Sequence, residues 1–150
     1  MKKINYEQGW DDFYAKINAK SINGIWDFTH HFDSVLKNAI FHFNMELNII
    51  DFGCGRGNNS AYFSNHVKSV IGLDASNVII KNSTQKHRNI KNIIFKQFNG
   101  LSNRETKLMH DKYDDSNVFV NGVFHQLNYL DAKEIIKNLK YFIGEKGCLF

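Results

Sequence analysis

The sequence predicts an α/β fold, a doubly wound and mostly parallel sheet with helices on both faces. Two observations support this fold: short apolar runs rich in β-branched residues alternate with amphipathic helical patterns, and a glycine-rich turn follows the first run. The chain has 150 residues, 43% of them hydrophobic and 14% aromatic, which is enough for one domain with a packed core. We expect an N-terminal helical and aromatic segment at 1–46 and the sheet-containing core at 47–150.

Five apolar runs predict the strands of this sheet. They are Leu47–Phe52, Ser69–Leu73, Ile93–Phe98, Asn117–Val120 and, just beginning, Cys148–Phe150. Right-handed crossovers between parallel strands give the order 3-2-1-4-5. A ligand is then expected at the carboxyl ends of the first two strands, next to the switch point between the first and the fourth.

Helical patterns lie between most of these runs. They cover Asp33–Phe43, Asn59–Asn65, Asn77–Arg88 and Asp131–Phe142. Asp33 and Asp131 are candidate N-caps, because a short carboxylate can accept a hydrogen bond from a free N–H group in the first turn of a helix. The last pattern predicts contact with the sheet through one apolar face, formed by Ile135, Ile136, Leu139 and Phe142.

The turn after the first strand has an acid followed by three alternating glycines, Asp51-Phe52-Gly53-Cys54-Gly55-Arg56-Gly57. Glycine lets the backbone adopt positive φ and lets a ligand approach the main chain. A dinucleotide fingerprint, G-x-G-x-x-G, would need glycine at position 58, where the chain has Asn58. The Asp51 carboxylate would repel a phosphate but can hold an ammonium group directly or through water. The turn therefore favours a nucleoside with an amino-acid tail, whose carboxylate the first N–H groups of the next helix can receive. A tight connection without ligand, with Asp51 as a cap, is the alternative.

A second acid, Asp74, closes the second predicted strand. It lies roughly 20 residues beyond the glycine turn, where nucleoside-binding α/β units place an acid for the ribose hydroxyl groups. The alternative is a role as N-cap of the helix that follows Ala75.

With these residues in view, the chain resembles the class I S-adenosylmethionine-dependent methyltransferases, whose first motif is D/E-x-G-x-G-x-G and whose second is an acid after strand two. The resemblance runs from about Trp10 to the end. It implies a Rossmann-like sheet, S-adenosylmethionine as cofactor, and methyl transfer to a small-molecule acceptor. The cofactor-binding residues that it implies are Asp51, Gly53, Cys54, Gly55, Gly57, Asp74, Ala75, Asn99 and Asn121.

Two residues after later strands extend this resemblance. Asn99 follows the third strand, where the family often has an acid that receives the adenine amine, and an amide oxygen can accept the same N–H. A plain turn residue is the alternative. His125 follows the fourth strand and is the candidate catalytic base, because the unperturbed pKa of histidine is about 6.5. A structural histidine is the alternative.

Aromatic residues gather before the first strand, in Tyr6–Tyr14 and Ile25–Phe28. They resemble the family's aromatic lid, which covers the cofactor and excludes water. A helix that packs its aromatic side chains into the core is the alternative. His30-His31 has no third ligand at metal spacing, so we expect no metal.

Composition narrows the acceptor and the compartment. The formal net charge of +4 suits nucleic acid, but the basic residues are scattered rather than gathered. The chain has no proline, and therefore lacks the [D/N/S]-P-P-aromatic turn of nucleobase-type nitrogen methylases; neither of its cysteines follows the fourth strand, as a cytosine-carbon methylase requires. A small-molecule acceptor remains. Without a leader, a long apolar run or a disulfide pattern, a cytoplasmic protein with no membrane contact is expected.

The segment Gly144–Phe150 resembles the turn into strand five. The family normally adds a helix and an antiparallel hairpin after it, so we expect a fold that lacks them. An open strand edge favours association, and we expect a homodimer or a second chain that completes the sheet. A non-catalytic S-adenosylmethionine-binding partner subunit or regulatory module is the alternative function.

Overall fold

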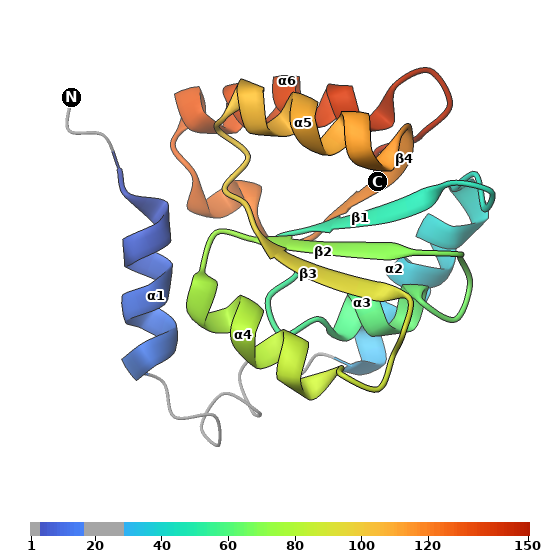
Figure 1. Ribbon diagram of the computed structural model, residues 1–150, viewed down its shortest axis with the longest axis horizontal. Coiled ribbons are helices and arrows are strands. Elements are labelled where there is room, and N and C mark those ends of the chain that lie inside the picture. The colour runs from blue at the N-terminus through green and yellow to red at the C-terminus, as the bar shows by residue number, and fades with distance from the viewer. Residues whose placement is uncertain (1–3, 17–28) are drawn as a thin grey trace.

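The computed structural model describes residues 4–16 and 29–150, and Figure 1 shows its elements in chain order. The helices are α1 (Tyr6–Lys16), α2 (Thr29–His42), α3 (Asn58–Phe63), α4 (Asn77–Lys86), α5 (Asn103–Tyr113) and α6 (Tyr129–Ile143), with a 3-10 turn, η2 (Phe124–Gln126). The strands are β1 (Asn48–Phe52), β2 (Val70–Asp74), β3 (Ile93–Gln97) and β4 (Ser116–Val120). None of the helices within these ranges is long and apolar enough to cross a membrane.

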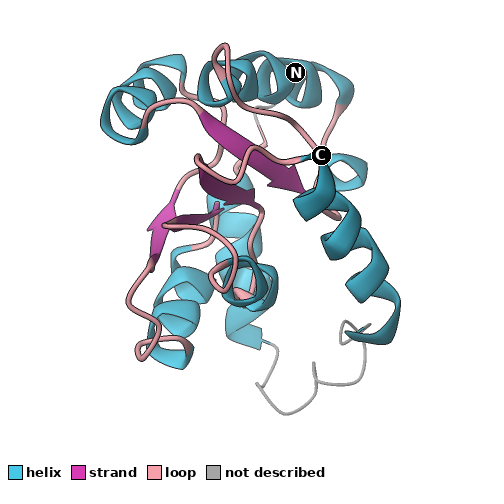
Figure 2. Cartoon of the chain, turned by 90° about the vertical axis from the view of Figure 1, so that its right-hand side faces the viewer, coloured by secondary structure: helices cyan, strands magenta, loops and turns pink. Residues whose placement is uncertain are grey.

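The four strands form one parallel sheet in the order β3-β2-β1-β4. Ile50 of β1 pairs with Ile71 on one side and with Val118 on the other. Figure 2 shows this twisted sheet between its helices. The predicted fold class and the order of its first four strands are confirmed.

The expected fifth strand is present only as an isolated bridge. Leu149 bridges Val118 in parallel, and the Val118 N–H donates to Cys148 O at 2.7 Å. The Cys148–Phe150 segment therefore lies at the fifth position, beside β4. A single bridge does not make it a strand, and the expectation is corrected in that respect.

Helices cover both faces of the sheet, with α5 and α6 on one face and α2, α3 and α4 on the other (Figure 1). Alternation along β1 divides its side chains between two cores: Ile49 packs toward α2 and α3, and Ile50 and Phe52 pack toward α5 and α6. Both faces are apolar because both are covered. The sheet thus forms a rigid platform whose carboxyl edge carries the loops described below.

Two predicted N-caps are wrong. Helix α2 begins at Thr29, so Asp33 lies inside it and not at its start. Helix α6 is capped by Asn128, whose side chain accepts from the Asp131 N–H at 2.9 Å. Asp131 is therefore the third helical residue and not the cap. At this position the negative charge of an acid interacts favourably with the positive end of the helix.

Two features of the α5–α6 layer differ from what sequence periodicity predicts. Ile136 is 41% exposed, although Ile135, Leu139 and Phe142 are buried as predicted. Helix α5 has no counterpart among the predicted helices, because Met109 is its only buried hydrophobic residue and the rest of the segment is mainly polar. Its packing against α6 stabilises it in place of a strong apolar stripe.

Candidate functional site

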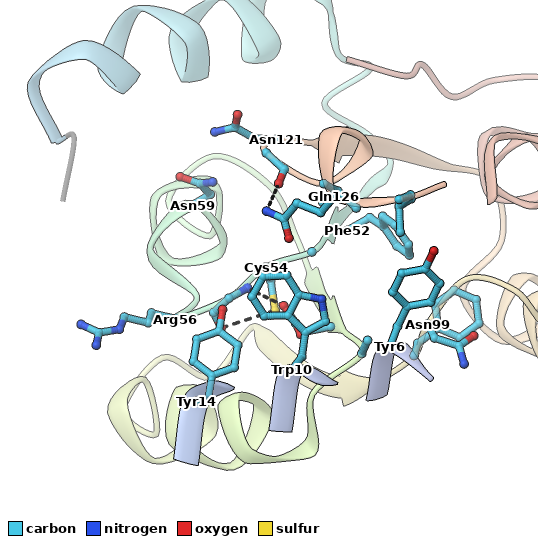
Figure 3. Close-up of a pocket in the computed structure, with 18 of the residues that line it drawn as sticks. Tyr6, Trp10, Tyr14, Phe52, Cys54, Arg56, Asn59, Asn99, Asn121 and Gln126 are labelled. Atoms are coloured by element: carbon cyan, nitrogen blue, oxygen red, sulfur yellow. Dashed lines mark hydrogen bonds between the residues drawn. The ribbon is translucent and has the colours of Figure 1, made fainter. Parts of the chain in front are cut away.

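A cavity of about 520 Å³ opens at the carboxyl edge of the sheet. The loops after all four strands contribute to its wall, together with side chains from α1 (Figure 3). Its position is the one that parallel α/β sheets use for ligands. Seven of the ten predicted site residues line it: Gly53, Cys54, Gly55, Asp74, Ala75, Asn99 and Asn121.

The three glycines of the turn all have positive φ, with values of 76° at Gly53, 49° at Gly55 and 73° at Gly57. A Cβ on Gly53 would lie 2.2 Å from Val123, and one on Gly57 would lie 2.5 Å from the ring of Phe95. At Gly55 the nearest atom would be the Tyr14 hydroxyl, at 3.8 Å. Two glycines therefore allow close packing, and Gly55 leaves its backbone open to the cavity.

Asp51 lies beneath this turn, with only 1% of its surface exposed, and does not line the cavity. Its Oδ2 accepts a hydrogen bond from Ser60 Oγ at 2.5 Å. Burial raises the pKa of Asp51 to about 6, and the charge of Asp74 adds to the effect, against the hydrogen bonds from Ser60. In the described structure, Asp51 therefore does not contact a ligand in the cavity directly. Its charge does act on Cys54, which lies in the cavity wall.

Asp74 faces the cavity directly. Its Oδ2 accepts from the Gly55 N–H and its Oδ1 from the Ser76 N–H, each at 3.0 Å. Each oxygen keeps a second lone pair for a ligand hydroxyl. Burial raises the pKa of Asp74 in spite of these bonds. The alternative role as a helix cap does not hold, because Ser76 caps α4 by accepting from the Ile79 N–H at 3.2 Å.

The pKa of the Cys54 thiol responds to the charges around the cavity wall. Burial raises its pKa well above the ordinary value, and the charges of Asp51 and Asp74 raise it further. Cys54 therefore stays a neutral thiol. The same field that disfavours a thiolate favours a bound cation.

The remaining predicted residues lie on either side of the turn. Asn99 donates to the Glu7 carboxylate at 2.6 Å, and its Oδ1 accepts from the Leu101 N–H at 2.9 Å. Asn121 lines the opposite side of the cavity, after β4. His125 is exposed in η2 and is not among the lining residues. Its catalytic role stays a prediction that this geometry does not strengthen.

Helix α1 lies over the cavity. Tyr6, Trp10 and Tyr14 are four residues apart, so they share one face of the helix and point into the cavity (Figure 3). No residue of α1 is buried, which argues against the alternative of a core helix. Hydrogen bonds hold α1 in place over the cavity. Asp11 Oδ1, for example, accepts from Ser76 Oγ at 2.6 Å and from the Val78 N–H at 3.0 Å.

Two predictions concern residues whose side chains the structure does not describe: the aromatic segment Ile25–Phe28 and the pair His30-His31. The segment Ile25–Phe28 lies outside the described residues, and so do the side chains of His30 and His31. Within the described residues, no group of three His, Cys, Asp or Glu side chains is arranged to hold a metal ion.

Sequence reasoning missed that α4 contacts the glycine turn. Ser83 and His87 lie one helical turn apart and both reach carbonyl oxygens of the turn. The sequence signal for this contact was Ser83, a polar residue on the face of α4 that is otherwise buried and apolar.

Comparison with known proteins identifies the family. Residues 49–147 match the family model described as "Methyltransferase domain". The chain belongs to this family. The expected resemblance to S-adenosylmethionine-dependent methyltransferases is confirmed, because that match covers most of the chain and includes the glycine turn and Asp74. None of the curated proteins matches the sequence.

Several solved structures share the fold of this methyltransferase domain. A SAM-dependent methyltransferase from Anabaena variabilis is 26% identical with a TM-score of 0.83, over 98% of this chain and 61% of that one. The DhpI–SAM–HEP complex is 12% identical with a TM-score of 0.71, over 99% and 66%. A complex of the Haloferax volcanii Trm112 methyltransferase activator with a putative methyltransferase is 16% identical with a TM-score of 0.64, over 93% and 58%. The chain thus spans about three-fifths of the length of the Anabaena protein.

Proposed function

We propose that this methyltransferase domain binds S-adenosylmethionine in the cavity beneath α1 and transfers its methyl group to a small-molecule acceptor. The observation that carries the proposal is the pair of carboxylates around the glycine turn. Asp51 is buried beneath the turn and Asp74 is half-buried in the cavity wall, and both carboxylates raise the pKa of Cys54. A ligand with positive charge on its sulfur and its amino group complements that field, whereas a pyrophosphate opposes it.

The lining residues fit the parts of this cofactor. Asp74 has one lone pair free on each oxygen for the two ribose hydroxyl groups. Asn99 and Ala75 stand at the ends of β3 and β2, where the adenine is expected, and the Asn99 side-chain oxygen can accept from the adenine amine. Gly53, Gly55 and Gly57 shape the turn beside the amino-acid tail, and Asn121 borders the acceptor side.

S-adenosylmethionine supplies an activated methyl group on a sulfonium. The protein's own contribution to transfer is to hold the acceptor in line with that group and to exclude water, which the aromatic face of α1 does by covering the cavity. A good nucleophile needs no general base for such a transfer. His125 is assigned as base only for an acceptor hydroxyl that approaches from the η2 side.

Isothermal titration calorimetry tests the cofactor proposal. We expect the protein to bind S-adenosylmethionine and S-adenosylhomocysteine, and not to bind NAD at the same concentrations. As a control, the titration is repeated at about 0.1 M and about 1 M salt, where the Debye length is about 10 Å and about 3 Å. Salt screens the field of buried charges less than that of surface charges, so the two titrations distinguish the two kinds of field. Binding of NAD, or no binding of either adenosyl ligand, contradicts the proposal.

A second function follows from the position of His125. This histidine is exposed and does not line the cavity, so the domain can also serve as a non-catalytic subunit that binds the cofactor for a partner chain. The complex of the Haloferax volcanii Trm112 methyltransferase activator with a putative methyltransferase is an example of a protein of similar fold bound to a partner chain. Release of S-adenosylhomocysteine during incubation with a panel of small acceptors supports the enzyme; a protein that binds the cofactor and releases none supports the subunit.

A further inference from the structure

Helix α1 is held on the domain by hydrogen bonds rather than by apolar packing. The structure describes every residue of this helix, and none of them is buried. None belongs to the two hydrophobic cores that the described residues form. The rings of Trp10, Phe13 and Tyr14 contact one another, with centroids 5.2 to 5.7 Å apart. Detaching α1 from the domain would therefore break hydrogen bonds but disrupt neither core.

Two of these hydrogen bonds hold the first turn of α1. The Tyr6 hydroxyl donates to Asp131 Oδ2 at 2.8 Å, at the start of α6. The side-chain nitrogen of Asn99, in the loop after β3, donates to Glu7 Oε1 at 2.6 Å. The bond to Glu7 is exposed to solvent, where water competes for both partners. The first turn is thus bound to two separate elements, but its bond to the loop after β3 is open to water.

Asp11 holds the middle of α1 against the start of α4. Its Oδ1 accepts from Ser76 Oγ and from the Val78 N–H, and Ser76 is fully buried. The carboxylate therefore lies at the positive end of α4. Partial burial of Asp11 raises its pKa, but the hydrogen bonds from Ser76 and the α4 backbone outweigh that effect, so the pKa lies below its ordinary value. Because bonds to a charged group are the stronger kind, we expect Asp11 to contribute most to holding α1 in place.

The part of α1 next to Asp11 is the part that covers the glycine turn. Trp10 and Tyr14 both line the cavity, and Figure 3 shows their rings beside Cys54. The Tyr14 hydroxyl lies close to Gly55, since a Cβ built on that glycine would be 3.8 Å from it. The hydrogen bonds of Asp11 thus hold two aromatic rings over the turn that is proposed to bind the cofactor.

We propose that Asp11 is a positioning residue that keeps α1 over the cavity, and that S-adenosylmethionine enters and S-adenosylhomocysteine leaves when α1 detaches from α4. The inference rests on the proposed function. It adds that α1 controls the exchange of the cofactor, through a residue that does not line the cavity.

Such a gate differs in its kinetics from a residue that binds the ligand. Weakening a gate speeds entry and exit alike, because both need the same opening, and the affinity stays the same. Loss of a contact to the ligand speeds exit and raises the dissociation constant by the same factor. Measuring both rate constants therefore separates the two roles.

The test is Asp11→Ala with S-adenosylhomocysteine as the probe. We expect the association and dissociation rate constants each to rise about tenfold, the size of a lost hydrogen bond to a charged group, and their ratio to change by less than about twofold. Stopped-flow measurement of the intrinsic fluorescence follows the exchange, because Trp10 lines the cavity. Calorimetry measures the dissociation constant independently.

Asp12→Ala is the matched control, since it removes the same charge one residue along α1. Asp12 Oδ1 accepts from Gln8 Nε2 at 2.8 Å, within the helix, so both rate constants should stay unchanged. Tyr6→Phe is a second variant, which removes the bond to Asp131 and keeps the ring. It should raise both rate constants by about threefold, and it keeps the proposal testable if Asp11→Ala does not fold.

The outcomes separate this proposal from the proposed function. Unchanged rate constants in Asp11→Ala and Tyr6→Phe overturn the gate, and so does faster dissociation with unchanged association. A wild-type protein that does not bind S-adenosylhomocysteine refutes the proposed function itself. A parallel rise of both rate constants at constant affinity supports both proposals.

Discussion

Replacing Asp51 by asparagine should make the protein more stable and a weaker binder. Burial disfavours the charged carboxylate and raises its pKa from an ordinary 3.8 to about 6. One pKa unit corresponds to about 1.4 kcal/mol, so the ionised carboxylate destabilises the folded state by about 3 kcal/mol at neutral pH. The asparagine side chain would be uncharged and would keep an oxygen for the Ser60 hydroxyl.

The expected gain is smaller than this figure, because the amide introduces N–H groups that need partners in a buried place. We expect Asp51→Asn to raise the free energy of unfolding by about 1–3 kcal/mol at about pH 7.5, or the thermal midpoint by about 2–10 °C. Thermal denaturation followed by circular dichroism measures it. Asp12→Asn is the control, because Asp12 is an exposed carboxylate of α1 and its loss should change stability by less than about 0.5 kcal/mol.

The pH dependence makes the test specific. A raised folded-state pKa means that the folded protein binds more protons than the unfolded one between 3.8 and about 6, so the wild type loses stability as pH rises through this window. The advantage of the asparagine variant should therefore fall by about half between about pH 7.5 and pH 5. A variant that is no more stable than the wild type, or whose advantage is the same at both pH values, refutes the reasoning. In calorimetry the variant should bind S-adenosylmethionine more weakly, on the order of 1 kcal/mol, since one negative charge near the cavity is gone.

Two further predictions concern the residues that surround the proposed cofactor. Asp74→Asn keeps an oxygen for the Gly55 N–H, and we expect the affinity for S-adenosylhomocysteine to fall by about 1–3 kcal/mol in calorimetry; an unchanged affinity would discredit the ribose assignment. Gly57→Ala places a methyl group 2.5 Å from the Phe95 ring and should lower the thermal midpoint more than Gly55→Ala, whose methyl group meets only the Tyr14 hydroxyl at 3.8 Å. Equal losses would mean that the strain of positive φ, about 1–2 kcal/mol at either position, outweighs packing.

The sheet could be predicted from the sequence because each strand carries its own signal. Residues buried on both faces give apolar runs such as Leu47–Phe52, and right-handed crossovers leave few possible orders. Helix α5 carries no such signal, because its one buried hydrophobic residue, Met109, gives no periodic stripe. The capping side chain of α6 was misassigned for a related reason: Asn128 and Asp131 are both good caps, and only their hydrogen bonds distinguish them.

The candidate site was predictable in its residue types but not in how they act. The alternation of Asp51 with three glycines pointed to a turn that holds a ligand, yet burial beneath that turn keeps Asp51 out of the cavity. The sequence also could not separate Gly55, which is open to the cavity, from Gly57, which the ring of Phe95 approaches from a strand far along the chain. Contacts between distant segments decide both questions.

Asp51 and Ser83 act on the glycine turn in different ways. Asp51 is kept ionisable in a place that destabilises the folded state, and a field from such a group is useful only if the ligand's charges are held at fixed positions relative to it. A glycine turn alone does not provide fixed positions, because the property that lets it approach a ligand also lets its peptides rotate. Ser83, which is 28 residues from Gly55 in sequence, donates to Gly55 O and so restrains that peptide from α4. The charges of Asp51 and Asp74 favour a bound cation beside the turn, and α4 holds one peptide of that turn through Ser83.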